Sequence, residues 1–138
     1  MEISEIKPGD VLFVWGKGLV EETIEWVTHG PSHCALFIDN KTLAEAQAGR
    51  TTGTALLGEY LAEIDRLEVW RDETLTDDER VQMVDYAKNH FGIRYDYLAI
   101  LIDLARFKLD IPLDNFHEGK RRICSSYIND IAKSVGHN

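Results

Sequence analysis

The stretch Gly30-Pro31-Ser32-His33-Cys34-Ala35-Leu36-Phe37-Ile38-Asp39 decides the fold of this chain. Proline disfavours helical geometry in the residue before it, so Gly30-Pro31 is expected to end a preceding helix. The apolar residues that follow predict a buried strand over 32–38, whose side chains alternate between two faces. An imidazole at the start of a buried strand is an unusual placement, which makes His33 the first candidate for a functional group.

Turn signals on both sides of this strand predict its neighbours. Asp39-Asn40-Lys41 predicts a hairpin turn into an antiparallel strand over 42–48. Lys7-Pro8-Gly9-Asp10 predicts a turn before a buried apolar strand over 11–15. Less regular patterns predict a loop over 49–58, a helical turn over 56–63 and a strand over 67–71.

Helical spacing of apolar residues occurs in three segments. It predicts helices over 19–29 and over 124–135, and a third helix that begins at the capping box of Thr76 and Glu79. The expected buried face of that third helix consists of Val81, Val84, Ala87 and Phe91, with Gly92 closing it. A strongly apolar segment over 98–109 is too short to cross a bilayer.

Composition limits the classes of function. A chain of 138 residues with 44% apolar content predicts one core and a single domain over 1–138. A formal net charge of −9 disfavours a surface for nucleic acid or anionic membranes, since both need clustered Lys and Arg. Residues 1–5 lack the features of a signal peptide, so a cytoplasmic or phage-encoded protein is expected. The two cysteines, Cys34 and Cys124, are expected to be free thiols. The oligomeric state is not predicted.

The second candidate functional group is Cys124, at the first position of the last expected helix. Spacings of four, three and four place it on one apolar face with Ile128, Ile131 and Val135. The partial positive charge and unpaired N–H groups of a helix N-terminus favour a thiolate and suit an oxyanion. Taken alone, a cysteine at a helix start is more often a small buried hydrophobe than a nucleophile.

A cysteine nucleophile needs a base, and the base needs a group that orients it. His33 suits the role of base, because the pKa of imidazole is close to neutrality. Glu45 or Gln47, on the strand expected beside it, is a candidate acceptor for the second imidazole N–H. The strand register decides between these two residues, and a carboxylate on a strand is by itself most often exposed to solvent.

Five short motifs in order resemble a known family. They are Pro8-Gly9-Asp10, Ser32 to Ile38, Ala44-Glu45-Ala46, Tyr95-Asp96-Tyr97 and Cys124-Ser125-Ser126. Their order resembles the NlpC-type papain-like cysteine peptidases, and more narrowly the circularly permuted YiiX/YebB-like branch, in which His precedes Cys. The resemblance implies an α+β, permuted papain-like fold with a nucleophile helix packed on a small antiparallel sheet or barrel.

The resemblance also implies roles for individual residues. Cys124 matches the nucleophile, His33 the base and Glu45 the residue that orients the base. Tyr95 matches an aromatic residue near the substrate cleft, whereas Ser126 stands where the branch often has Glu. The implied function is that of a thiol hydrolase, an amidase or peptidase that cleaves an amide or a cell-wall-type peptide bond. It needs no metal and no organic cofactor.

Three alternatives remain at this stage. The first is a lipid acyltransferase or thioesterase of the lecithin–retinol acyltransferase type acting on a lipid ester, although the Asn-Cys-Glu-His signature of that group is absent. The second is a binding module that keeps the fold without turnover. The third is a zinc site at His29, His33 and Cys34, which the break at Gly30-Pro31 disfavours.

Overall fold

The computed structural model describes residues 2–16, 31–46, 51–61, 64–94 and 124–136, without the side chains of 64, 65 and 124–126. The expected helix over 19–29 and the apolar segment over 98–109 lie outside these ranges. In chain order the elements are a 3-10 helix at Ile3–Glu5, β1 Val11–Gly16, β2 His33–Phe37, β3 Thr42–Glu45, β4 Gly53–Leu56, α2 Leu57–Tyr60, β5 Ile64–Trp70, α3 Asp77–Asn89 and α5 Cys124–Ser134.

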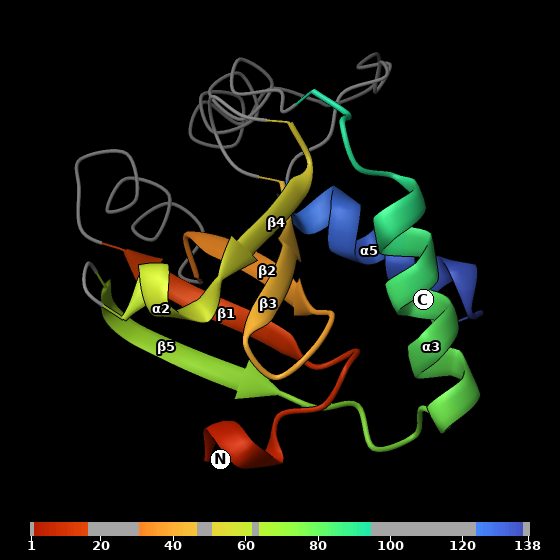
Figure 1. Ribbon diagram of the computed structural model, residues 1–138, viewed down its shortest axis with the longest axis horizontal. Coiled ribbons are helices and arrows are strands. Elements are labelled where there is room, and N and C mark those ends of the chain that lie inside the picture. Colours follow the sequence, from red (N-terminus) through yellow and green to blue (C-terminus); the bar gives the residue numbers. More distant parts are fainter. Residues whose placement is uncertain (1, 17–30, 47–50, 62–63, 95–123, 137–138) are drawn as a thin grey trace, which may run out of the picture.

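The strands form one antiparallel sheet in the order β4-β3-β2-β1-β5. The expected strands over 11–15, 32–38 and 42–48 are confirmed as β1, β2 and β3. The hairpin between β2 and β3 is fixed by Asp39, whose carboxylate accepts hydrogen bonds from the amides of Lys41 and Thr42 at 2.8 Å each. The architecture is therefore α+β, as expected (Figure 1).

The loop predicted over 49–58 is wrong, because Gly53–Leu56 forms β4 and pairs with β3. Ala55 is the one buried residue of this edge strand, and its neighbours Thr54 and Leu56 are exposed. A strand with a single buried side chain has little apolar pattern, and its main-chain pairing leaves no trace in the sequence.

Each face of the sheet has its own apolar core. The α2-side core consists of Ile6, Leu12, Val14, Ala35, Phe37, Leu43 and Leu57. The helix-side core, which lies beneath α3 and α5, consists of Leu36, Ala44, Ala46, Met83, Ala87, Tyr127 and Ile131 (Figure 1). Alternation along β2 thus divides its residues between two cores, as the sequence predicted.

The predicted start of α3 is confirmed, but its predicted buried face is partly wrong. The Thr76 hydroxyl accepts a hydrogen bond from the Glu79 amide, and the Glu79 carboxylate accepts one from the Thr76 amide at 2.7 Å. Val81 is 57% exposed, and the buried residues are Arg80, Met83, Val84 and Ala87. The inward side chain of Arg80 explains the difference. Charged residues are usually exposed, so the pattern of apolar residues alone does not place Arg80 on the buried face of the helix.

Arg80 turns inward because it meets a fully buried carboxylate, that of Asp10. Arg71 Nε and Nη2 donate to the two Asp10 oxygens at 2.9 and 2.7 Å, and Arg80 Nη1 donates to Oδ1 at 3.3 Å. Gly9 precedes this aspartate with φ +85°, and a Cβ there would lie 3.2 Å from Arg80 Cγ. The Pro8-Gly9-Asp10 turn is thus shaped for an ionic cluster, the Asp10–Arg71–Arg80 cluster, that joins β5 to α3.

None of the helices in the described ranges combines the length and the apolar character that a membrane span requires.

Candidate active site

The start of β2 is fixed by Ser32, the residue before His33. Its amide donates to the Val14 carbonyl at 2.9 Å, and its hydroxyl accepts from the Gly16 amide at 3.0 Å. These bonds tie the chain to β1 before the strand begins. His33 is therefore the first residue of β2 and lies opposite Val14 of β1.

The structure brings His33 and Glu45 together. Their side chains meet at the α2-side face of the sheet, with Nε2 and Oε2 3.0 Å apart. Glu45 is 4% exposed and the His33 side chain 15% exposed, so this carboxylate does not face solvent as an isolated strand carboxylate usually would. The register pairs Glu45 with Ala35, which makes it the diagonal neighbour of His33. Gln47, the alternative acceptor, lies outside the described residues.

A third member of this group, Tyr60, was missed by the reading of the sequence. Tyr60 is the last residue of α2, and its hydroxyl donates to Glu45 Oε2, the oxygen that also contacts His33. Its ring stacks on the imidazole, with centroids 5.9 Å apart and planes 13° apart. The position of Tyr60 follows from the topology of the sheet. Helix α2 follows β4 directly in the chain, and the pairing of β4 with β3 brings α2 beside Glu45. We call His33, Glu45 and Tyr60 the His33 group.

The described part of α5, Cys124–Ser134, has Cys124 as its first residue. The Cys124 side chain lies outside the described residues, as does the whole of Tyr95. The helix packs against β2 on the helix-side core, through Tyr127 and Ile131. His33 instead shares the opposite face of β2 with Ala35 and Phe37. The other cysteine, Cys34, is buried.

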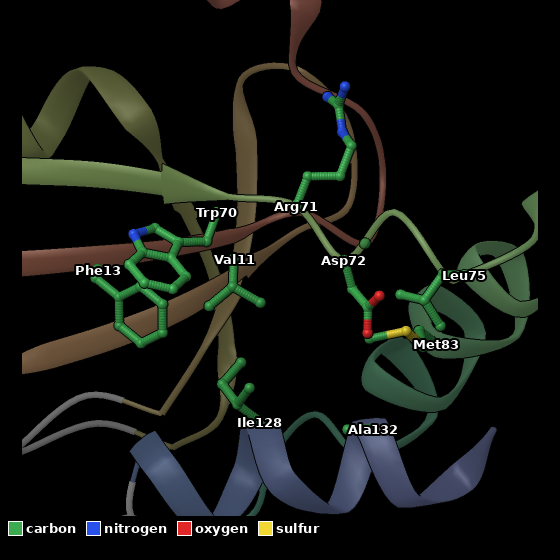
Figure 2. Close-up of a pocket in the computed structure, with 10 residues that line it drawn as sticks. Val11, Phe13, Trp70, Arg71, Asp72, Leu75, Met83, Ile128 and Ala132 are labelled. Carbon is green, nitrogen blue, oxygen red and sulfur yellow. The ribbon is translucent and has the colours of Figure 1, made fainter. Parts of the chain in front are cut away.

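A cavity of about 300 Å³ lies on the helix-covered side of the sheet, away from the His33 group. Figure 2 shows Val11, Phe13 and Trp70 on one side of it and Ile128 and Ala132 of α5 on another. Its lining is mostly apolar, and none of His33, Glu45 and Tyr60 belongs to it. The cavity therefore does not mark the histidine as part of a binding pocket.

Of the three residues of the zinc alternative, His29 lies outside the described residues, and His33 and Cys34 lie on opposite faces of β2. Within those residues, no three His, Cys, Asp or Glu side chains come together as a metal site would require. His33 and Glu45 provide two donors.

Comparison with known proteins identifies a fold. No protein-family model and no curated protein matches the chain. The chain is similar to the crystal structure of the metalloprotein YiiX from Escherichia coli O157:H7, with a TM-score of 0.69 and 19% sequence identity. The similarity covers 94% of this chain and 66% of the YiiX chain. The YiiX-like part of the resemblance is thereby supported at the level of structure, and the chain has a YiiX-like α+β fold.

Proposed function

We propose that this chain is a thiol hydrolase that cleaves an amide or peptide bond, with a permuted papain-like arrangement of Cys124, His33 and Glu45. The observation that supports it most is the buried hydrogen bond between His33 and Glu45 at the start of β2. A buried carboxylate on one imidazole nitrogen fixes the tautomer and stabilises the imidazolium, the role of the third member of a catalytic triad. The proposal also places the Cys124 thiol in the first turn of α5, a second feature of such sites.

In the proposed reaction, His33 Nδ1 takes the proton of the Cys124 thiol while Nε2–H donates to Glu45. The sulfur attacks the substrate carbonyl, and the backbone N–H at the start of α5 stabilises the oxyanion. The C–N bond then breaks, the leaving amine takes the proton from His33, and an acyl-enzyme remains. His33 next removes a proton from water, which attacks the thioester and releases the acid and the thiol.

The proposal makes a geometric demand. His33 faces the α2-side core, whereas α5 covers the opposite face of the same strand. Two side chains on opposite faces of a sheet meet only around its end. Because His33 is the first residue of β2, the proposal places the Cys124 thiol beyond that end of the strand.

Metal chemistry is a further matter, because YiiX carries the description metalloprotein. The described residues of this chain do not form a metal site, because no three of their His, Cys, Asp or Glu side chains lie together. His33 and Glu45 would leave about half of the positions around a four-coordinate zinc ion to other donors. The proposed reaction accordingly routes no step through a metal.

The test is the pH dependence of Cys124 alkylation by iodoacetamide in a Cys34→Ala background. A thiolate paired with an imidazolium reacts with a pH midpoint well below the ~8.5 of a free thiol. Adding His33→Ala should raise that midpoint by one unit or more, because the imidazolium that stabilises the thiolate is lost. Each unit corresponds to roughly 1.4 kcal/mol of that stabilisation. Mass spectrometry of the modified peptide confirms which cysteine has reacted.

His90→Ala is the matched control, because His90 contacts Tyr86 of α3 and takes no part in the His33 group. It should leave the alkylation profile unchanged. An alkylation midpoint near that of a free thiol, unaffected by His33→Ala, would show that no thiolate–imidazolium pair exists and would refute the proposal.

A further inference from the structure

We propose that Tyr60 is a positioning residue for His33 and acts through Glu45. In this role its hydroxyl lowers the proton affinity of the His33–Glu45 pair and so keeps the imidazole available as a base near neutral pH. This inference rests on the proposed function for its catalytic meaning. The effect of the Tyr60 hydroxyl on the protonation of the His33 imidazole can be measured without any substrate.

Two contacts of Tyr60 suit this role, beside its packing against the α2-side core. Its hydroxyl and His33 Nε2 both approach the same oxygen, Glu45 Oε2. Its ring lies nearly parallel to the imidazole, with planes 13° apart and centroids 5.9 Å apart. One side chain thus limits both the orientation of the imidazole and the position of its acceptor, in a place where the carboxylate is 4% exposed.

The direction of the effect follows from charge. A hydroxyl that donates to a carboxylate stabilises the ionised form. When the proton is on the carboxyl, the charge that this donor stabilises is removed. When it is on the imidazole, the carboxylate stays ionised, but the Tyr60 hydroxyl competes with the imidazolium for Oε2 and so stabilises the charged imidazole less than the bare carboxylate would. Loss of the hydroxyl therefore favours the protonated pair, whichever of the two groups carries the proton.

The elements around His33 carry other titratable groups, and Glu59 and Arg66 have partners of their own. On α2, Glu59 is exposed and accepts from the Leu56 amide at 3.4 Å. On β5, Arg66 lies over the Trp15 ring at 4.4 Å and pairs with Glu68. Facing His33, β1 presents Val14, and β3 presents Glu45. Cys34 lies on the opposite face of β2.

The experiment is an NMR titration of the His33 ring in the full chain, comparing the parent protein with Tyr60→Phe. Phenylalanine keeps the ring that stacks on the imidazole and removes only the donor. The midpoint of the His33 titration should rise by roughly one pH unit, the size expected for a hydrogen bond to a charged group. Assignment uses the signal that disappears in His33→Gln.

Tyr86→Phe is the matched control, because Tyr86 also stacks on a histidine, His90, with centroids 4.0 Å apart. Within the described residues the Tyr86 hydroxyl makes no hydrogen bond to a carboxylate. Tyr86→Phe should therefore leave both histidine titrations unchanged. If Tyr60 acts by packing alone, Tyr60→Phe should also leave the His33 titration midpoint unchanged. An unchanged His33 midpoint in Tyr60→Phe would therefore overturn the inference.

A second variant keeps the test decisive if Tyr60→Phe folds poorly. Site-specific 3-fluorotyrosine at Tyr60 retains size and strengthens the donor, so the His33 midpoint should fall instead of rising. A midpoint that stays in place would also overturn the inference. The proposed function fails separately, when Cys124 alkylation proves independent of His33 even though Tyr60 shifts the His33 titration.

Discussion

The carboxylate of Glu45 shows at the scale of single residues how a polar group can be held inside this fold. With 4% of its surface exposed, it has lost nearly all contact with water. Burial of a charge is costly unless donors replace the water, and here His33 and Tyr60 both contact Oε2. The stability of this region therefore depends on the acceptor as much as on its two partners.

Glu45→Ala should be strongly destabilising, because it leaves the donors of His33 and Tyr60 without this acceptor and removes a buried side chain. Each unsatisfied buried polar group costs about 1–3 kcal/mol, so a loss of about 2–4 kcal/mol in the free energy of unfolding is expected. Urea unfolding followed by circular dichroism measures it. Glu73→Ala, at an exposed carboxylate, should change stability by less than about 0.5 kcal/mol. Equal effects of the two variants would contradict this account of Glu45.

At the scale of elements, the start of α3 depends on one hydroxyl. Thr76→Ala removes the acceptor for the Glu79 amide, and loss of such an N-cap costs about 1 kcal/mol. Thr76→Ser retains the hydroxyl and should restore most of the stability. Thermal unfolding of the three proteins provides the comparison. If serine rescues nothing, the hydroxyl does not act as the cap.

The orientation of α3 gives a second prediction at this scale. Val84 is 7% exposed, whereas Val81 is 57% exposed, although both were expected on the buried face. Val84→Ala should cost about 2 kcal/mol, because two buried methyl groups are lost, and Val81→Ala should cost less than about 0.5 kcal/mol. Denaturant midpoints of the two variants measure the difference. The opposite order would mean that the helix is rotated relative to the structure.

The elements also show what a sequence can and cannot reveal. β1 and β2 were predictable because continuous apolar runs between turn signals are typical of buried strands. β4 was not, since Ala55 is its only buried residue and its pairing is a main-chain property. The buried face of α3 was partly misjudged because Arg80 points inward to Asp10, a contact between residues 70 positions apart.

The same distinction applies to the candidate site. The contact between His33 and Glu45 could be proposed because a short hairpin joins their strands and limits the registers available. Tyr60 could not be found in this way, because its position depends on the pairing of β4 with β3, which brings the following helix α2 beside Glu45. Local patterns thus identify pairs of residues within a hairpin, and contacts that need three elements require the structure.

At the scale of the whole molecule, the Asp10–Arg71–Arg80 cluster links parts of the chain that are far apart in sequence. Burial by itself raises the pKa of Asp10, but the Arg71 and Lys7 hydrogen bonds and the charges of Arg71 and Arg80 lower it below its ordinary 3.8. A carboxyl whose folded-state pKa is depressed adds stability above its unfolded pKa. That stability is lost as the pH falls through about 4 toward the folded value.

The free energy of unfolding should therefore decrease between pH 5 and pH 3, and Asp10→Asn should flatten this dependence. At pH 7 the variant should be about 3–5 kcal/mol less stable, because Arg80 remains buried beside a neutral partner. Urea titrations at each pH provide the data. Asp39→Asn is the comparison: hydrogen bonds from the Lys41 amide lower the pKa of Asp39 too, but this exposed residue should contribute far less. An acid transition unchanged in Asp10→Asn would assign it to other carboxylates.

The strand order has a consequence for how the molecule assembles. Strands β2, β3 and β4 follow one another along the chain, whereas β1 must find β5 across an intervening segment of about fifty residues. Contacts between near neighbours in sequence form faster than distant ones. His33, Glu45 and Tyr60 all belong to the early-forming segment. We therefore expect their arrangement to form before β5 pairs with β1 and its Leu67 and Val69 pack against the α2-side core.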